Sequence, residues 1–305
     1  MRQGQEPEKR EIRVSGGSGR LDKYLVDNCP GLTRSLIQHL IMSGDVTVNG
    51  LPARPAARLK DGDLIVLYIP SPEPAVLVPE HIPFKVIYED GDVAVIDKPA
   101  GLTVYPAPGH SSHTLANALL ERYPDLAVFG PSLRPGIVHR LDKDTSGLMV
   151  IARNERSRQN LIEQFKSRSL KKCYLALVRG TLTPERGAIA APIGRHPSNR
   201  KRMAILSRGR EARTDYQVVR HFRGYTLVDA CIQTGRTHQI RVHFAAIGHP
   251  VVGDQDYGTK STLVGRQFLH AYLLEFNLPD DNQRRTFKSE LPPDLETVLA
   301  ALGGS

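Results

Sequence analysis

HRLDKDTSGLMV, at residues 139–150, is a densely polar segment that leads directly into an apolar strand. Five of its first six residues are ionisable, and an Asp-Thr-Ser-Gly turn separates them from LMVIA at 148–152. Loops that end on rigid strands are a common place for catalytic groups. The segment is therefore a candidate active-site loop, although a solvated turn would also explain it when it is taken alone.

Two carboxylates in this loop, Asp142 and Asp144, lie only two residues apart. A glycosidase needs carboxylates that flank the sugar from opposite sides, and one tight turn is a poor match to that arrangement. A metal site would be the alternative, but no His, Asp or Glu cluster elsewhere in the sequence completes one. We therefore expect no metal at this loop.

TGRTHQIRVH, at residues 234–243, predicts a helix that carries arginines on different faces. Arg236 lies on one face and Arg241 on the next. An arginine on a partly buried face needs a carboxylate partner, because an unpaired buried charge is costly. Asp142 is the natural candidate for the partner of Arg241.

Strands outnumber helices in the long C-terminal part of the chain, and no regular βαβ alternation appears. KKCYLALVRG, at residues 171–180, is one such strand, on which Tyr174 and Ala176 alternate on one face. An ordinary core position is the default interpretation of Tyr174. The pattern predicts an α+β domain with a mixed, mainly antiparallel sheet rather than a doubly wound fold.

The first 70 residues predict a separate, small α/β module. Helical spacing at 20–28 and 32–44 is followed by short strands, and an Asn-Gly pair at 49–50 is a hairpin signal. Four prolines within SPEPAVLVPEHIP indicate a linker. The expected divisions are a mobile N-terminus over 1–17, the small module over 18–70, a linker over 71–82 and the large domain over 83–305.

The charge balance points to a polyanionic partner. The chain has 305 residues, with 41 Lys and Arg against 32 Asp and Glu, which gives a net charge of +9. Residues 195–213 hold seven basic side chains and one acidic, and 153–172 hold seven and two. Two solvated faces would be the simple explanation, but two basic patches in one domain fit a groove that follows the phosphates of a nucleic acid better.

The cysteine pattern and the lengths of the apolar runs indicate the cellular compartment of the protein. Cys29, Cys173 and Cys231 are an odd number with no CxxC pair, so we expect reduced core thiols in a cytoplasmic protein. The first ten residues lack the apolar stretch of a signal peptide. The longest apolar runs are shorter than the ~18 residues that a spanning helix needs, so a soluble protein with no membrane partner is expected.

Several segments together resemble a known family, the RluA-type pseudouridine synthases of the large ribosomal subunit. The small module, with RLDKYL and TRSLIQHLIMSGDVTVNG, is similar to the S4 RNA-binding domain found ahead of many members. One departure is Tyr105, where many members carry a histidine at the entrance to the site. The matching segments of the large domain are GLTVYPAPG, PGIVHRLDKDTSGLMVIAR, KCYLALVRG, IGRHPSNRKRMAI and TGRTHQIRVHFAAIGHPVVGD.

This resemblance implies the pseudouridine synthase fold and a reaction without a cofactor, in which uracil is detached at N1–C1′, turned, and rejoined through C5. The family aspartate falls on Asp142 and its arginine partner on Arg241. The tyrosine that packs against the base falls on Tyr174, where a π contact is worth ~1–3 kcal/mol. Arg140 resembles the residue that fills the stack when uridine is flipped out.

Further residues are expected to support the site or bind RNA. His139 and Thr145 would brace the loop. Phosphate contacts are expected from basic side chains, several of them on a loop with a Pro-Ser-Asn composition. These are Arg34, Arg195, Arg200, Lys201, Arg202 and Arg236.

The resemblance favours a cytoplasmic, monomeric isomerase that acts on a hairpin-loop uridine of 23S rRNA in the large-subunit precursor. Three alternatives remain at this point: a synthase that acts on tRNA, a non-catalytic RNA-binding assembly factor, and a nucleoside or glycoside hydrolase. The set of Asp142, Tyr174 and Arg241 argues against a binding module, which has no need of a carboxylate facing phosphates. A hydrolase lacks a second well-placed carboxylate.

Overall fold

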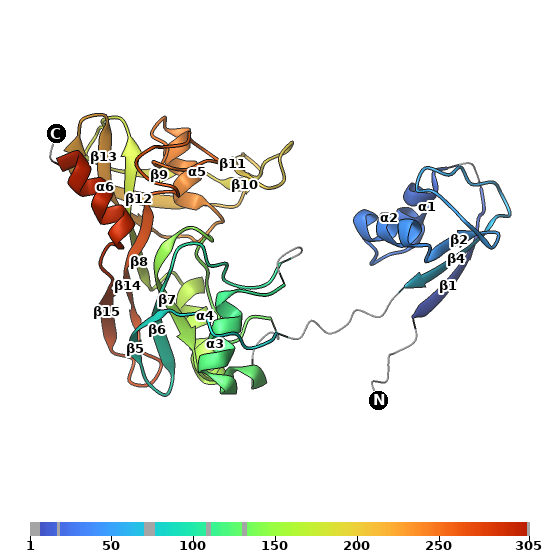
Figure 1. The fold of residues 1–305 in the computed structure, drawn as a ribbon, viewed down its shortest axis with the longest axis horizontal. Helices are drawn as coiled ribbons and strands as arrows, with labels where there is room; N and C mark the ends of the chain where they lie inside the picture. The colour runs from blue at the N-terminus through green and yellow to red at the C-terminus, as the bar shows by residue number, and fades with distance from the viewer. Residues whose placement is uncertain (1–6, 17–18, 70–76, 108–110, 130–132, 304–305) are drawn as a thin grey trace. The chain divides into compact units, whose positions relative to one another are not determined.

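The structure is a computed structural model that describes residues 7–16, 19–69, 77–107, 111–129 and 133–303. The chain divides into two compact units, residues 1–75 and 76–305, and each is described by itself (Figure 1). Every helix among the described residues is too short or too polar to serve as a membrane span.

The smaller unit is a four-stranded antiparallel sheet with two helices, as expected for the small α/β module. Its strand order is β1-β4-β2-β3. The Asn-Gly pair forms the predicted hairpin, with positive φ at Asn49 and Gly50. The elements are β1 (Glu8–Arg13), α1 (Leu21–Asn28), α2 (Arg34–Ser43), β2 (Val46–Val48), β3 (Leu51–Pro52) and β4 (Leu64–Ile69).

Local sequence signals account for α2. The Thr33 side chain accepts a hydrogen bond from the Leu36 N–H at 3.3 Å, which caps the first turn. Gly44 ends the helix with a φ of 88°, which glycine adopts at little cost. Leu40 and Ile41 are buried in the core of the unit, so the helix packs one face against the sheet.

The expected mobile segment over 1–17 is wrong for residues 8–13. These residues form β1 and pair with β4 from Glu8 opposite Ile69 to Arg13 opposite Leu64. Charged side chains suit an exposed edge strand, and pairing with β4 is a long-range contact without a local signal. Residues 1–6 and 17 lie outside the described part.

The expected linker over 71–82 is wrong for its second half. Leu77 is buried in the core of the larger unit, and the Asn117 side chain donates to the Val78 carbonyl at 2.7 Å. An apolar residue among the prolines is enough to attach this stretch to the core. Residues 71–76 lie outside the described part.

The larger unit contains a nine-stranded sheet in the order β5-β6-β7-β14-β8-β13-β12-β9, with β15 paired to β14. Strands β7 and β14 run parallel and the other pairs are antiparallel, so the predicted mixed, mainly antiparallel sheet is confirmed. The strands are β5 (Lys85–Glu89), β6 (Val93–Lys98), β7 (Ser146–Ala152), β8 (Lys171–Arg179), β9 (Arg186–Ala190), β12 (Arg213–Phe222), β13 (Tyr225–Ile232), β14 (Leu269–Asn277) and β15 (Arg284–Lys288).

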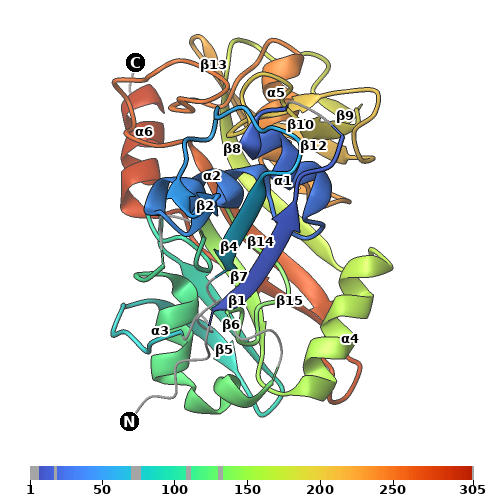
Figure 2. The same cartoon turned by 90° about the vertical axis from the view of Figure 1, so that its right-hand side faces the viewer.

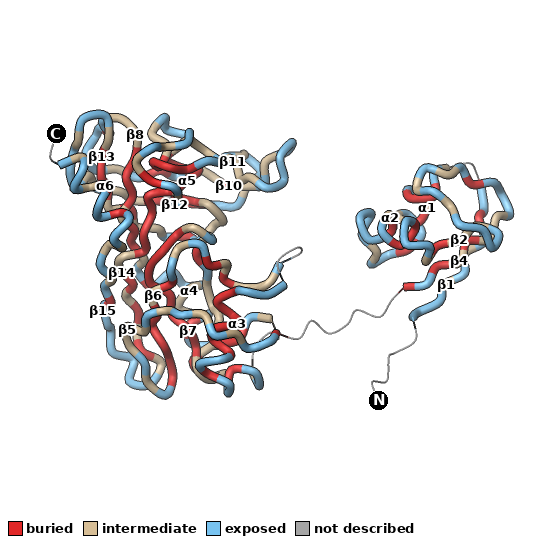
Figure 3. The backbone as a smooth tube through the Cα atoms, in the orientation of Figure 1, coloured by how far each residue is buried: buried red, intermediate tan, exposed pale blue. Residues whose placement is uncertain are grey.

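Two helices cover opposite faces of β6 and β7 (Figure 2). Leu119 of α3 belongs to the same core cluster as Ile96, and Leu161 of α4 belongs to the cluster of Val95 on the other face. These central strands are buried along most of their length (Figure 3). The remaining elements of this unit are α3 (Leu115–Arg122), η1 (Pro124–Val128), α4 (Glu155–Lys166), β10 (Ile193–Arg195), β11 (Met203–Ile205), α5 (Gln239–Ala246) and α6 (Pro293–Gly303).

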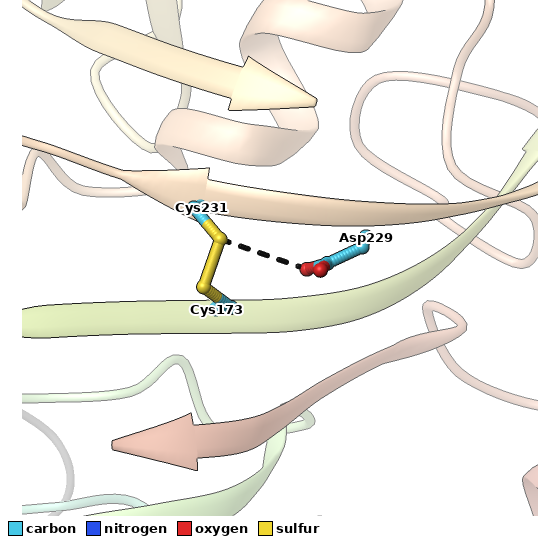
Figure 4. Close-up of side chains that lie close together, drawn as sticks. All are labelled: Cys173, Asp229 and Cys231. Atoms are coloured by element: carbon cyan, nitrogen blue, oxygen red, sulfur yellow. Dashed lines mark hydrogen bonds between the residues drawn. A yellow bond between two sulfur atoms is a disulfide. The ribbon is translucent and has the colours of Figure 1, made fainter. Parts of the chain in front are cut away.

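The expectation of three reduced cysteines is wrong for two of them. Cys173 on β8 and Cys231 on β13 are direct cross-strand partners with a Cα–Cα distance of 4.0 Å, and their sulfurs form a disulfide (Figure 4). Their separation of 58 residues gave no sign of this, because cross-strand register is not visible in cysteine spacing. Cys29 is free and buried, as expected.

Candidate active site

The loop at residues 139–145 is tightly packed at its C-terminal end, where it joins the sheet. It leads into β7, where a Cβ on Gly147 would lie 2.4 Å from the Ala271 carbonyl oxygen of β14. Gly147 also has a φ of 117°, which residues with side chains rarely adopt. The hydroxyl of buried Thr145 accepts a hydrogen bond from Gln267 Nε2 at 3.2 Å. The base of the loop is therefore held in one position.

A buried lysine lies beneath this loop. Lys98, at the end of β6, is fully buried, and its Nζ donates to the carbonyl oxygens of Leu102 at 2.9 Å and Lys143 at 3.0 Å. Burial lowers the pKa of Lys98 to about 7, and the charges of Asp144 and Asp142 act against that shift. Sequence analysis did not single out Lys98, although a lysine two residues after the apolar run 93–96 was a usable signal.

Asp142 and Arg241 contact each other, in the arrangement that the sequence led us to expect. Arg241 Nη1 donates to Asp142 Oδ2 at 3.2 Å. The carboxylate side chain is 16% exposed and the guanidinium side chain 6%, so the pair opens to solvent on the Asp142 side. This leaves the Asp142 carboxylate accessible to a substrate while one side of it is fixed by a cation.

Arg241 has a second and stronger partner, Asp254, which sequence analysis missed. Nε and Nη2 of Arg241 donate to the two Asp254 oxygens at 2.7 and 2.9 Å, and Asp254 is fully buried. Burial acts to lower the pKa of Arg241, but contact with Asp254 and Asp142 raises it overall. Asp256 contacts Nη2 as well, at 2.7 Å. A usable signal was the pair of aspartates directly after a glycine, in GDQD at 253–256.

Tyr174 of β8 forms one wall of a pocket of ≈ 430 Å³ that Asp142 and Arg241 also line. The residue is 7% exposed. Burial, with a contribution from the charge of Asp142, raises the pKa of Tyr174, so the phenol is neutral at physiological pH. The ring can therefore offer an uncharged surface for packing beside the carboxylate. A second pocket of ≈ 440 Å³ shares Asp142 and Arg241, so the loop lies between the two.

His139 and Arg140 have different surroundings on the loop. His139 Nε2 accepts a hydrogen bond from the Val150 N–H at 2.9 Å, and burial, together with the charge of Lys172, lowers the pKa of His139 to about 3. A neutral imidazole that ties the loop to β7 fits the expected bracing role. Arg140 is exposed, and its Nη1 donates to the Tyr105 hydroxyl at 2.6 Å.

The residues expected to contact phosphates fall into three places. Arg236 lines the first pocket, and its Nε donates to the Glu211 carbonyl at 2.9 Å. A second group lies on the hairpin β10–β11, outside both pockets. Arg34 belongs to the smaller unit, where its Nη2 donates to buried Asp22 at 3.1 Å. The hairpin group is Arg195, Arg200, Lys201 and Arg202.

Two aromatic or imidazole side chains near Asp142 were also missed. His238 Nε2 lies 3.9 Å from Asp142 Oδ1, and burial lowers the pKa of His238 although Asp142 opposes this. The other ring nitrogen of His238 is 2.8 Å from the Tyr257 hydroxyl, which also accepts from the Met203 N–H at 2.7 Å. Tyr257 thus links the hairpin β10–β11 to the surroundings of Asp142. It follows the carboxylates of GDQD in sequence, and no local pattern marked it.

The fold agrees with comparisons to known proteins. The family model for RNA pseudouridylate synthases matches residues 92–246, and the S4 domain model matches 19–65. The chain therefore belongs to the RNA pseudouridylate synthase family, and it is an isomerase that converts uridine in RNA into pseudouridine. It carries an N-terminal S4 domain.

Full-length relatives place it more narrowly, within the RluA-type group that the sequence resembled. An RNA pseudouridine synthase of Aquifex aeolicus is 46% identical over 304 residues, 96% of each chain. Ribosomal large subunit pseudouridine synthase D of Pseudomonas aeruginosa is 40% identical over 306 residues, 96% of this chain and 94% of that one. The solved structure of human RNA Pseudouridylate Synthase Domain Containing 1 is 29% identical, with a TM-score of 0.58 over 74% of this chain and 97% of that one.

Proposed function

We propose that the protein isomerises one or a few hairpin-loop uridines of 23S rRNA, as a cytoplasmic monomer that acts on the large-subunit precursor. The support for rRNA is the near full-length similarity to enzymes named ribosomal large subunit pseudouridine synthase D. The support for the chemistry is a single observation, the Asp142 carboxylate held 3.2 Å from Arg241 at the wall formed by Tyr174.

In the proposed reaction, the N1–C1′ bond of uridine breaks and a C5–C1′ bond forms. The proton leaves C5, and N1 gains one. Asp142 is the carboxylate that acts at the sugar, either by attack at C1′ or by removal of a sugar proton. Arg241 orients the carboxylate through its charge-assisted hydrogen bond from Nη1. Tyr174 stacks on the detached base and limits its movement.

The RNA-binding roles follow from exposure and charge. A uridine must leave its stack before a side chain can reach C1′, and exposed Arg140 is suited to fill the space that it leaves. Arg236 at the pocket and the basic side chains of the hairpin β10–β11 would contact phosphates. Arg34 retains an exposed side chain despite its contact with Asp22, and would serve the S4 domain in the same way.

Primer extension after carbodiimide treatment tests the target. RNA from cells with and without the gene is compared across 23S rRNA and, in parallel, across tRNA. We expect stops at one or a few 23S positions that disappear when the gene is deleted. Stops that disappear only in tRNA would contradict the rRNA assignment but leave the chemistry intact.

Asp142→Asn tests the chemistry, with Asp144→Asn as its matched control in the same loop. The change keeps size and removes the charge, so tritium release from RNA labelled at uridine C5 should fall below ~1% of wild type while RNA affinity stays within about twofold, because phosphate contacts dominate binding. Asp144→Asn should retain substantial activity. Turnover of Asp142→Asn above ~1% would remove Asp142 from the proposed role.

A further inference from the structure

Lys172 is a cation in the wall of the first pocket that the proposed reaction has not used. It precedes Tyr174 by two positions on β8, so both side chains point to the same face, with about 7 Å between their positions. Both line the pocket. Among the described residues, the Lys172 ammonium has no hydrogen-bond or ion-pair partner.

The ammonium is surrounded by the Phe165 ring, the backbone of Gly235 and the neutral imidazole of His139, whose pKa its charge helps to lower. Its Nζ lies 4.8 Å from the centre of the Phe165 ring of α4. A Cβ added to Gly235 would lie 3.6 Å from the Lys172 Nζ, so on that side the ammonium faces backbone without a side chain. Burial lowers the pKa of Lys172 to about 8, with no carboxylate acting against that shift. A partly buried cation without a counter-charge is costly to the free protein, and such a cost is typical of a group that meets its partner only in the complex.

The position of Asp142 indicates which part of the substrate the ammonium meets. Asp142, Tyr174 and Lys172 line the same pocket, and the two side chains of β8 lie about 7 Å apart along the strand. The edge of uracil that carries O4 is opposite N1, where the sugar is attached, so a uracil stacked on Tyr174 with its sugar at Asp142 can place O4 at Lys172. Cytosine has an amino donor at that place, where uracil has an acceptor.

We propose that the Lys172 ammonium donates a hydrogen bond to uracil O4 in the first pocket and thereby selects uridine over cytidine. The same contact stabilises the negative charge that uracil carries while it is detached from the sugar. The inference rests on the proposed function. An RNA phosphate oxygen has the same acceptor chemistry, so the experiment has to separate these two sources.

The test compares wild type, Lys172→Met and Lys171→Met on a stem-loop that carries the uridine found by primer extension. Methionine is unbranched like lysine and can pack on Phe165 without a charge. Lys171 is exposed on the opposite face of β8 and serves as the control. We expect the single-turnover rate of pseudouridine formation to fall about 10- to 100-fold in Lys172→Met, since hydrogen bonds from charged donors are the stronger kind. Lys171→Met should match wild type.

Affinity for two RNAs identifies the contact. Kd is measured for the stem-loop with uridine and with cytidine at the target position, over a range of salt. Wild type should bind the uridine form more tightly, and Lys172→Met should bring the ratio of the two Kd values close to one. Equal weakening for both RNAs, with a shallower salt dependence and an unchanged rate, would show a phosphate contact and overturn the proposal.

Two further outcomes separate the hypotheses. Thermal unfolding of Lys172→Met should show no loss of stability, because an unpaired cation has been removed from a partly apolar site. A lower Tm with an unchanged Kd ratio would show a purely structural lysine and overturn the proposal. A wild type that forms no pseudouridine in the stem-loop would contradict the proposed function, whereas an active Lys172→Met that matches wild type contradicts this inference alone.

Discussion

Replacing Asp254 by asparagine removes one charge from the support of Arg241 and keeps the size of the side chain. Asp254 is fully buried, Arg241 is 6% exposed, and two contacts of 2.7 and 2.9 Å join them. Loss of one partner from a buried pair costs about 3–5 kcal/mol. Because Asp142 and Asp256 still contact Arg241, we expect about 3 kcal/mol, and at ~2–4 °C per kcal/mol for a domain of this size the Tm should fall by about 6–12 °C.

Asp256→Asn is the matched control for this prediction. Asp256 also contacts Arg241 at 2.7 Å, but its side chain is 51% exposed, so its loss should cost no more than about 1 kcal/mol. Tritium release, measured where both variants are folded, should fall more in Asp254→Asn, because Nη1 of Arg241 is then no longer held toward Asp142. Equal Tm values and equal rates for the two variants would refute the assignment of Asp254 as the anchor.

The difference in Tm between wild type and Asp254→Asn should depend on pH in a defined direction. Burial acts to raise the pKa of Asp254, but the hydrogen bonds from Arg241 lower it overall. A carboxylate with a lowered pKa contributes its stability above the unfolded value near 4 and loses it as the pH falls through the folded value. The gap in Tm between wild type and Asp254→Asn should therefore be constant near pH 7 and close only below about pH 4. A gap that already closes near pH 6 would contradict the pairing.

Three other substitutions follow from the same site. Arg241→Ala should lower kcat because the Asp142 carboxylate is no longer oriented, with partial rescue by Arg241→Lys, because a point charge is a poorer clamp than a planar fork; full kcat in Arg241→Ala would count against the pair. Arg236→Ala should weaken RNA binding and reduce the salt slope by about 1, as for one lost phosphate contact; an unchanged slope would exclude that contact. His139 has its pKa lowered to about 3, so protonation favours the unfolded state and stability should decline as the pH falls from about 6.5 toward 3, by up to ~1.4 kcal/mol per pH unit. His139→Gln should flatten this decline in unfolding experiments, and a slope equal to wild type would be inconsistent with the burial of the ring.

The predictions that the structure confirms rest on patterns that are visible in the sequence. The hairpin at Asn49 and Gly50 needs only two residues that tolerate positive φ, and both are adjacent in sequence. The predicted helix over 234–243 begins later, at Gln239, because His238 has a φ of 56° that no helix accommodates. The mixed sheet followed from the number of strands and the lack of βαβ alternation, which are properties of the chain as a whole.

Features that depend on register or on distant contacts were not predictable in this way. Cys173 and Cys231 face each other only because β8 and β13 pair in one register among many. The Asp142 partner of Arg241 was inferred from the cost of a buried charge, but that argument does not say how many carboxylates share the cation. Asp254 was missed for this reason, and Lys98 because its position just after an apolar run suggests burial only weakly. The roles of Asp142, Tyr174 and Arg241 stay predictions until the variants are measured.

The three carboxylates around Arg241 have an electrostatic consequence for how RNA can approach. Asp142, Asp254 and Asp256 carry three negative charges against one positive, so this cluster has a local charge of −2 inside a chain whose net charge is +9. A cluster with more carboxylates than cations repels phosphates, whereas Arg140 and Arg236, which line the first pocket, attract them. We therefore expect an RNA to keep its backbone at these arginines, with the sugar, the part that becomes electron-poor, nearest the carboxylates.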